Sequence, residues 1–427
     1  MSRRTRWLLA VVLVLLAVLG SSLYWLSRPG QVPGLLLDRI GNALGLEISA
    51  SGGAEYRLRG TPMLLLRDVV AREPGQPTPL LRAGRVYLSL PWSTIRARGA
   101  DLTIKRVELD DAQVDWPALQ RWLATRPPSK EARIPTLTDG LRISRGSLVS
   151  GDGGDGGGWR IDGISADLAS LHPDRPLRTH MRGRYSAPPL SIGFDLALAL
   201  NTPATLVAGQ VSGLGANGRI AIDQGDWRLP GHVALSGPLQ WAKQVLRVSP
   251  ARMGLSARYE SGDTSLPFAL GLHGPLRFER STWTLAPVGV ALRGEGTIPV
   301  LDAGGALALG RRLAVHLDGT IAQWPDAWPT LPPPIGQSRS PLPFVLRYLG
   351  AAGLSDIAGL RLRRDATTFD ARFRLPTMLA WLDSEATSPL PPLDGRLVTP
   401  RLEISGAVLE GVEVDFDDGD PGDIHAP

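Results

Sequence analysis

Residues 191–200 read SIGFDLALAL and carry the clearest strand pattern in the chain. Successive side chains of a β-strand point to opposite faces of the sheet. One face of this stretch is therefore apolar and consists of Ile192, Phe194, Leu196, Leu198 and Leu200. The other face is small or polar and consists of Ser191, Gly193, Asp195, Ala197 and Ala199. Such a strand must cover its apolar face with a second sheet, with its own sheet closed into a barrel, or with something that is not protein.

The same alternation recurs over most of the chain, between turns rich in Gly and Pro. It begins after Leu46 and is plain around Val86 to Leu90 and around Leu102 to Ile104. Further strands are predicted at Leu141–Val149, Trp159–Leu168, Ala204–Leu214, Trp227–Leu235, Arg252–Tyr259, Leu266–His273, Trp283–Leu292 and Arg312–Ile321. Two hairpins are predicted near the end, Gly359–Arg364 with Thr368–Leu375 and Arg396–Ser405 with Val408–Asp417. The fold is therefore expected to be mainly β.

Only a few short helices are expected. Asp115 is a suitable N-cap, Pro117 follows in the first turn, and Leu119, Trp122 and Leu123 share one face before Pro127-Pro128 ends the helix. An amphipathic helix is predicted from Leu35 to Leu44, either against the first sheet or on the bilayer surface. Shorter helices are predicted at Leu239–Leu246, Leu342–Leu349 and Thr377–Leu382.

The N-terminal residues 7–26 form an uncharged apolar run, WLLAVVLVLLAVLGSSLYWL. About 20 such residues span a bilayer as a helix, so a single transmembrane helix is predicted. Arg3, Arg4 and Arg6 precede the run and only Arg28 follows closely, which places the N-terminus in the cytoplasm. A cleaved signal peptide is the alternative, although no A-x-A-like site is present.

Composition excludes several classes of protein. The chain of 427 residues is 43% hydrophobic, which rules out general disorder. It contains no Cys, and therefore no disulfide, thiolate metal site or Cys nucleophile. The 46 basic and 41 acidic residues nearly balance, and no basic run with interleaved aromatics predicts nucleic acid binding.

No motif in the sequence predicts catalysis, a cofactor or a metal. Gly151, Gly153 and Gly156 fit G-x-G-x-x-G, but a strand and not a helix is predicted to follow, so a hairpin loop explains them better. The acidic residues near Asp152 and Asp415 do not have the spacing of a calcium loop. His172 and His180 are the closest histidines, and no H-E-x-x-H or G-x-S-x-G occurs. We therefore expect a protein that is not an enzyme.

Three consecutive segments resemble the N-terminal domain of the AsmA family of bacterial envelope proteins. They are GTPMLLLRDVVAREPG (60–75), PLLRAGRVYLSLPWSTI (79–95) and ADLTIKRVELDDAQVDW (100–116), and they follow one N-terminal apolar run, as in that family. The segment LDGRLVTPRLEISGAVLEGVEVDF (393–416) is similar to one that recurs in the C-terminal part of such proteins. The match covers about a quarter of the chain and consists of hydrophobicity and turns, without catalytic residues.

The resemblance implies an elongated, curved antiparallel sheet that carries lipid in an apolar interior, as in the repeating β-groove proteins to which this family is assigned. The groove lining would be Ile192, Phe194, Leu196, Leu198 and Leu200, together with Phe369, Ala371 and Phe373. The alternative is that these side chains meet a facing sheet in a dry sandwich core. The expected organisation is a cytoplasmic tip (1–6), the transmembrane helix (7–26), an AsmA-like domain (27–126), a β-groove body (127–323), a Pro-rich linker or loop (324–343), a C-terminal β region (344–417) and an acidic tail (418–427).

The expected function is that of an inner-membrane-anchored periplasmic protein that holds or conducts phospholipid or another acyl lipid for outer membrane assembly or lipid homeostasis. Its expected partners are the lipid, the membrane and an envelope protein. The alternative is a periplasmic scaffold whose β-sandwich docks an outer membrane assembly or secretion component. A third alternative, an anchored hydrolase, lacks any nucleophile constellation in the sequence.

Overall fold

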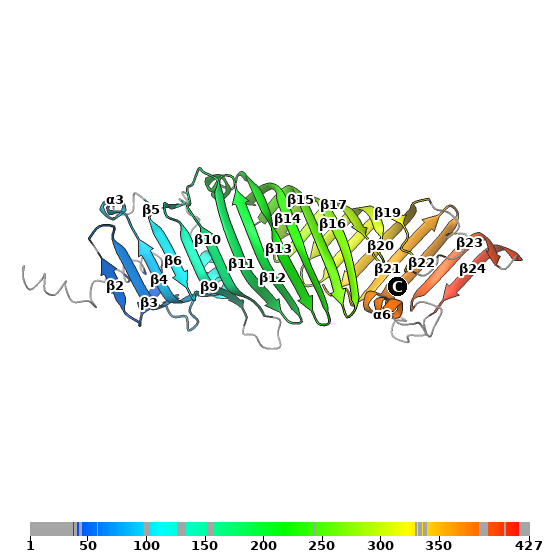
Figure 1. The fold of residues 1–427 in the computed structure, drawn as a ribbon, viewed down its shortest axis with the longest axis horizontal. Coiled ribbons are helices and arrows are strands. Elements are labelled where there is room, and N and C mark those ends of the chain that lie inside the picture. The colour runs from blue at the N-terminus through cyan, green and yellow to red at the C-terminus, as the bar shows by residue number, and fades with distance from the viewer. Residues whose placement is uncertain are drawn as a thin grey trace, which may run out of the picture. The chain divides into compact units, whose positions relative to one another are not determined.

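The structure is a computed structural model of the chain. It describes residues 37, 41, 45–57, 59–97, 102–125, 134–151, 158–242, 245–328, 331, 335, 340–383, 392–404 and 407–417. The expectation of a mainly β fold with few helices is confirmed: 22 strands belong to one sheet, and two short strands form another. In the described part the helices are short, namely α3 (Trp92–Arg96), α4 (Trp116–Ala124), α5 (Pro203–Val207) and α6 (Leu375–Asp383). The chain divides into two compact units, residues 1–197 and 198–427. Figure 1 shows their strands coloured along the chain.

Unit 1 contains a mixed sheet, whereas the sequence predicted an antiparallel one. Its strands are β1 (Glu47–Ala50), β2 (Ala54–Arg57), β3 (Met63–Arg72), β4 (Leu81–Ser89), β6 (Arg106–Asp110), β7 (Gln113–Asp115), β9 (Leu141–Ser150), β10 (Trp159–Leu168) and β11 (Leu177–Ala187). Strands β6 and β7 both pair with β4 on one side and run parallel to β9 on the other. A parallel pair needs a long connection, and the chain between β7 and β9 supplies one that contains α4. The short strands β5 (Thr103–Ile104) and β8 (Thr136–Leu137) form the separate sheet.

Helix α4 begins as predicted. Asp115 caps it by accepting a hydrogen bond of 2.7 Å from the backbone N–H of Ala118. Ala118 is buried in a cluster with Leu46, Ala71 and Leu80, and Leu119 and Trp122 pack against that cluster. Leu123 was expected on the same face, but it is 53% exposed. The buried stripe of the helix is therefore narrower than the sequence suggested.

Unit 2 is an antiparallel meander in which each strand pairs with the next along the chain. Strand β12 (Leu190–Leu200) contains the division between the units. The following strands are β13 (Val211–Gln224), β14 (Trp227–Ala242), β15 (Val245–Ser261), β16 (Thr264–Glu279), β17 (Thr282–Gly294), β18 (Val300–Leu309), β19 (Leu313–Gln323), β20 (Leu342–Gly350), β21 (Ile357–Arg364), β22 (Thr367–Arg374), β23 (Asp394–Ile404) and β24 (Ala407–Phe416). The two C-terminal hairpins lie where the sequence predicted them.

Two predicted helices are wrong. Residues 239–242 lie in β14 and residues 245–246 in β15, and Leu239 pairs with Val248. Residues 342–349 lie in β20, where Leu342, Phe344 and Tyr348 are buried and Pro343, Arg347 and Leu349 are exposed. Short stretches that mix apolar and polar residues fit a strand as well as a helix, and only the pairing partners decide between them. The third predicted helix, at 377–382, is confirmed as part of α6.

One predicted strand also begins too early. Residues 204–207 lie in α5, and β13 starts only at Val211. Pro203 stands in the first turn of this helix, where proline is favoured because its missing N–H has no helical acceptor. The hydroxyl of Thr205 donates to the carbonyl of Thr202 at 2.8 Å and closes the turn.

A line of bulges crosses β14 to β17. Gly237-Pro238 in β14 lies against Pro250 in β15, and Gly274-Pro275 in β16 lies against Pro287 in β17 in the same way. The strand register shifts at each of these points. A bulge bends a strand and increases its twist, and proline is tolerated there because the ladder hydrogen bond is already lost. The two hairpins therefore repeat one bend, which the sequence analysis did not detect.

Candidate functional site

Unit 2 contains a cavity of about 1320 Å³ that is partly open to solvent. One wall consists of the ends of β14 to β17, with Leu229, Phe268 and Leu292. The opposite wall consists of β21, β22 and α6, with Phe369 and Trp381. Pockets for drug-sized ligands usually measure about 300–1,000 Å³. The cavity is thus large enough for a bulkier molecule.

The sheet of unit 2 curls so that early and late strands face each other. Each strand pairs only with its neighbours, so β14 and β22 can line one cavity only if the sheet turns back on itself. The turn is closed at one point by Gln224 of β13. Its Nε2 lies only 2.6 Å from where a Cβ atom on Gly353, between β20 and β21, would stand.

The lining of the cavity is apolar and aromatic. Trp227 and Tyr259 lie 6.0 Å apart between ring centroids, and Trp324 meets Trp328 edge to face at 4.8 Å. Phe369 and Phe416 form a second edge-to-face pair at 6.0 Å. Among the described lining residues only Asp226 carries a carboxylate, and none is Lys, Arg or His. The site therefore offers apolar contact area, and its described lining contains no pair of groups suited to acid and base catalysis.

Strand β17 runs through three zones of this apolar face. Leu292 lines the cavity. Leu285, Val288 and Val290 lie in a closed core that also contains Leu317, Ile321, Leu342, Phe344 and Leu397. Trp283 stands two residues before Leu285, where the face reaches the surface, and is 39% exposed. The core thus separates the cavity from an exposed end of the same face.

At that exposed end the apolar side chains form a row across five strands. Directly paired residues of neighbouring strands lie on the same face of a sheet. The pairs Trp241–Leu246, Leu246–Phe278, Phe278–Trp283 and Trp283–Leu309 therefore place these five side chains side by side, and we call them the exposed row. Trp241 is 59% exposed, and the rings of Phe278 and Trp283 are in contact at 4.6 Å.

The Pro-rich segment also contributes to the interior of unit 2. Trp324 and Leu331 pack against the closed core, and Ile335 is fully buried in it. The guanidinium of the buried Arg364 donates to the carbonyl oxygens of Ile335 and Ser340. The described parts of this segment therefore lie over the sheet and form part of its core.

The predicted lining residues fall into two groups. Phe369, Ala371 and Phe373 line the cavity. The five apolar residues of β12 are not among its lining residues, and each of them is only half-buried. The ring of Phe194 lies over Gly183 of β11, and Leu200 packs against a small cluster around Val248. Their role as a groove lining stays a prediction.

Sequence reasoning missed most of the cavity wall. Trp227, Tyr259 and Phe268 were assigned to strands, Trp324 and Trp328 to a linker or loop, and part of α6 to a helix, but none of them was assigned to a site. Their signal is the concentration of aromatic residues at strand ends and in the Pro-rich segment. Only the curl of the sheet brings these positions together.

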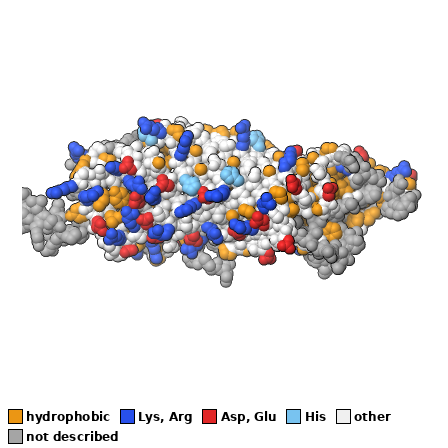
Figure 2. All heavy atoms as spheres, viewed as in Figure 1, with side chains coloured by type: hydrophobic (Ala, Val, Ile, Leu, Met, Phe, Trp, Pro, Cys, Tyr) orange, Lys and Arg blue, Asp and Glu red, His pale blue; other side chains and the backbone are white. Residues whose placement is uncertain are grey.

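The remaining sequence features are the predicted membrane span, the Gly-rich loop, the histidines and the distribution of charge. No helix of the described residues is long and apolar enough to cross a membrane, and the predicted span 7–26 lies outside these residues, as do 1–6 and 418–427. Residues 152–157 of the Gly-rich loop also lie outside them. His180 contacts Asp195 at 2.6 Å, and the described residues contain no group of three metal-ligating side chains. Basic and acidic side chains are interspersed over the visible face (Figure 2).

Comparison with models of known protein families gives no match for this chain. Curated proteins and solved structures likewise give no significant match.

Proposed function

We propose that this chain is a bacterial inner-membrane protein whose periplasmic part holds phospholipid or another acyl lipid. The apolar cavity of unit 2 is the observation that carries the proposal. Moving an acyl chain from water into such surroundings is favourable by about 0.8 kcal/mol per CH₂ group. The aromatic walls around Trp227 and Phe369 provide these surroundings, and the resemblance to AsmA proteins supports the same class of ligand.

Within unit 2, holding a lipid in the cavity is better supported than conducting it along the sheet. A lipid tail moving along β17 from Leu292 toward Trp283 would have to displace the closed core around Leu285 and Val288. Opening a packed core costs several kcal/mol for each large side chain that is displaced. The cavity therefore acts as a container for the lipid.

The exposed row supports contact with a bilayer. Trp is favoured at the headgroup layer of membranes because its ring is apolar and its N–H is polar. Trp241 and Trp283 stand at neighbouring hairpin ends, with Arg280 in the turn beside Trp283. This combination of Trp and Arg suits the surface of an anionic membrane.

The localisation in this proposal rests on residues 1–28. The apolar run 7–26 anchors the chain once, and the three arginines before it keep the N-terminus in the cytoplasm. The bulk of the chain is then periplasmic, where it serves outer membrane assembly or lipid homeostasis.

The decisive experiment is native mass spectrometry of the full chain released from detergent, followed by lipid extraction. We expect acyl lipid bound at about one molecule or more per chain, and less in a Phe373→Asp variant. A chain that carries no lipid, or equal lipid in both proteins, would exclude the cavity as the binding site.

A scaffold role is the second candidate, and the edge strand β24 favours it. In the described residues β24 pairs with β23 alone, and Val408 and Leu409 are exposed. An open edge of this kind can accept a strand from an envelope protein partner. A pull-down that depends on β24 but not on Phe373 would support this role over lipid binding.

A further inference from the structure

A second, polar pocket of about 450 Å³ lies in unit 1. It is lined by Arg57, Arg59, Gly60, Thr61, Tyr87, Ser89, Lys105, Arg106 and Asp139. Four of these residues are cationic and one is anionic. The pocket thus has a positive charge, in contrast to the apolar cavity of unit 2.

The cations converge because of strand pairing. Arg57 of β2 pairs with Met63 of β3, Met63 pairs with Ser89 of β4, and Ser89 pairs with Arg106 of β6. Directly paired residues share one face of a sheet, so Arg57, Ser89 and Arg106 point to the same side. Lys105 precedes Arg106, and its backbone N–H donates to the carbonyl of Ser89 at 2.8 Å.

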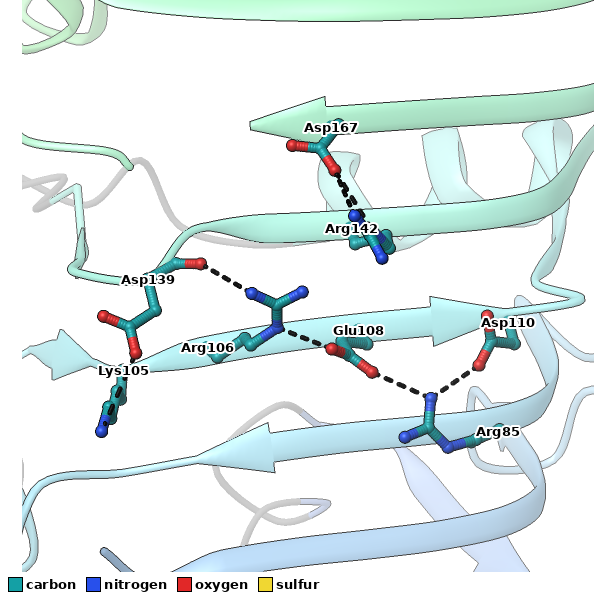
Figure 3. A network of polar contacts seen from close by, with 8 residues as sticks. All are labelled: Arg85, Lys105, Arg106, Glu108, Asp110, Asp139, Arg142 and Asp167. Carbon is teal, nitrogen blue, oxygen red and sulfur yellow. Dashed lines mark hydrogen bonds and ion pairs between the residues drawn. The ribbon is translucent and has the colours of Figure 1, made fainter. Parts of the chain in front are cut away.

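A network of ion pairs fixes Arg106 at the edge of the pocket (Figure 3). Its Nε donates to Glu108 Oε1 at 2.6 Å, and its Nη1 donates to the carbonyl oxygen of Asp139 at 3.3 Å. Glu108 also binds Arg85 through Oε2 at 2.9 Å, and Arg85 in turn binds Asp110 at 2.8 Å. Both oxygens of Glu108 are therefore engaged, and this carboxylate is shared between two guanidinium groups.

The remaining cations lack full compensation. Lys105 Nζ lies 3.8 Å from Asp139, which is a loose contact. In the part of the chain that the structure describes, no carboxylate pairs with Arg57 or Arg59. The loop that carries Arg59 is held in place, since Trp92 Nε1 donates to the carbonyl of Gly60 at 2.9 Å and the N–H of Leu90 donates to that of Pro62 at 3.0 Å.

We propose that this pocket is a binding site for a phosphate group. Arginine recognises phosphate through its planar fork of N–H donors, and several cations around one anion give strong, charge-assisted hydrogen bonds. The hydroxyl groups of Thr61 and Tyr87 add further donors. The phosphate comes from a lipid headgroup or from a soluble compound, and both present the same chemistry to the site. The proposal does not depend on the cavity of unit 2.

The test is calorimetric titration of the full chain with inorganic phosphate and, separately, with dihexanoylphosphatidic acid. The probe variant is Arg57→Gln/Arg59→Gln. The matched control is Arg142→Gln/Arg160→Gln, which removes the same charge from exposed pairs with Asp167 and Asp162 in unit 1. Circular dichroism and the melting temperature verify the fold of both variants.

We expect the probe variant to bind at least about tenfold more weakly than the wild type, and the control to bind within about twofold of it. Tighter binding of the phosphatidic acid than of inorganic phosphate would identify a headgroup site, and equal binding would identify a soluble ligand. The proposal is overturned if neither probe binds the wild type, if the probe variant binds like the wild type, or if the control loses as much affinity.

Discussion

The α-carbon of Gly274 in β16 lies directly against the carbonyl oxygen of Pro287 in β17, so that a Cβ atom on Gly274 would overlap this oxygen. The φ angle of Gly274 is +158°, which side chains disfavour. Because both partners are backbone atoms, neither can move aside without moving a strand. Gly237 of β14 and Pro250 of β15 make the same contact.

This contact predicts that Gly274→Ala destabilises unit 2 by about 2–4 kcal/mol, because overpacking against backbone cannot relax through a rotamer change. Gly254→Ala in β15 is the control, since a Cβ atom there meets nothing within 4 Å. We expect the control to lie within about 1 kcal/mol of the wild type. Urea unfolding measures both, and equal stability of the two variants would show that the bulge is not tightly packed.

The cavity predicts different outcomes for aspartate at three positions. Phe373 is half-buried on the cavity wall, so Phe373→Asp is expected to fold and to lose most of its bound lipid. Leu342 is 2% exposed, belongs to the closed core and is not among the cavity-lining residues, so Leu342→Asp is expected to cost several kcal/mol and to prevent folding. Leu349→Asp is the control, since Leu349 is 58% exposed.

Circular dichroism and quantified lipid per chain separate these outcomes. Full lipid retention in a folded Phe373→Asp protein would contradict the assignment of the cavity.

The apolar face of β12 is only half-buried, so we expect it to tolerate charged side chains. A dry sandwich core would bury Phe194 and Leu196 completely, whereas both are only half-buried. The double variant Phe194→Asp/Leu196→Asp is therefore expected to keep its fold with a modest loss of stability. If this face lines a lipid path, the variant also retains less lipid than the wild type. Loss of folding would favour the sandwich core, and wild-type lipid content would remove β12 from the path.

The ion-pair network predicts an acid-dependent contribution to the stability of unit 1. Burial raises the pKa of Glu108, but hydrogen bonds from Arg106 and Arg85 outweigh it, so that the pKa lies below its ordinary value of 4.5. A group whose pKa is lowered by folding stabilises the fold above its unfolded pKa and loses this contribution as pH falls through its folded pKa. Glu108→Gln is thus expected to cost about 1 kcal/mol at pH 7 and progressively less below about pH 4.5.

Denaturant unfolding of the wild type and Glu108→Gln between pH 3 and pH 7 measures this difference. Asp167→Asn, in an exposed pair with Arg142, serves as control. A constant difference between wild type and Glu108→Gln across the range would show that the carboxylate is not coupled to the two arginines.

The arginines before the apolar run predict the topology of the anchor. Alkaline phosphatase fused after Pro427 is expected to be active, because it folds only after export, and a reporter restricted to the cytoplasm is expected to be silent there. Replacing Arg3, Arg4 and Arg6 by Asn is expected to reduce the phosphatase signal. An active cytoplasmic reporter on the wild-type chain would refute both the localisation and the proposed access to periplasmic lipid.

The sequence predicted the strands best where alternation is strict and a short turn follows. The hairpins of β21 with β22 and of β23 with β24 are examples, because period and turn agree there. It failed at residues 239–246 and 342–349, where the spacing of apolar residues over eight positions is compatible with both the helical and the strand period. The parallel pairing of β9 with β6 was also missed, since register between distant strands leaves no local pattern.

The cavity wall was likewise predicted only in part. Alternation alone placed Phe369, Ala371 and Phe373 on one face, and the structure has them on the wall. Trp227 and Trp381, however, meet that face only through the curl of the sheet. The bulges at Gly237 and Gly274 bend their own strands locally. Those bends are encoded by Gly-Pro and Pro at matching places in successive hairpins. They are detectable only when the two hairpins are aligned with each other.

That correspondence between the hairpins has an evolutionary consequence. Each strand of unit 2 pairs only with its neighbours. The hairpin of β14 and β15 carries the same bend as the next hairpin, and the two pair along that bend. A tandem duplication of one such hairpin would therefore extend the wall by two strands without breaking any existing pairing. In chains of this architecture the size of the cavity can thus change in steps of one hairpin. Such a change needs only the duplication of a DNA segment and leaves the existing core as it is.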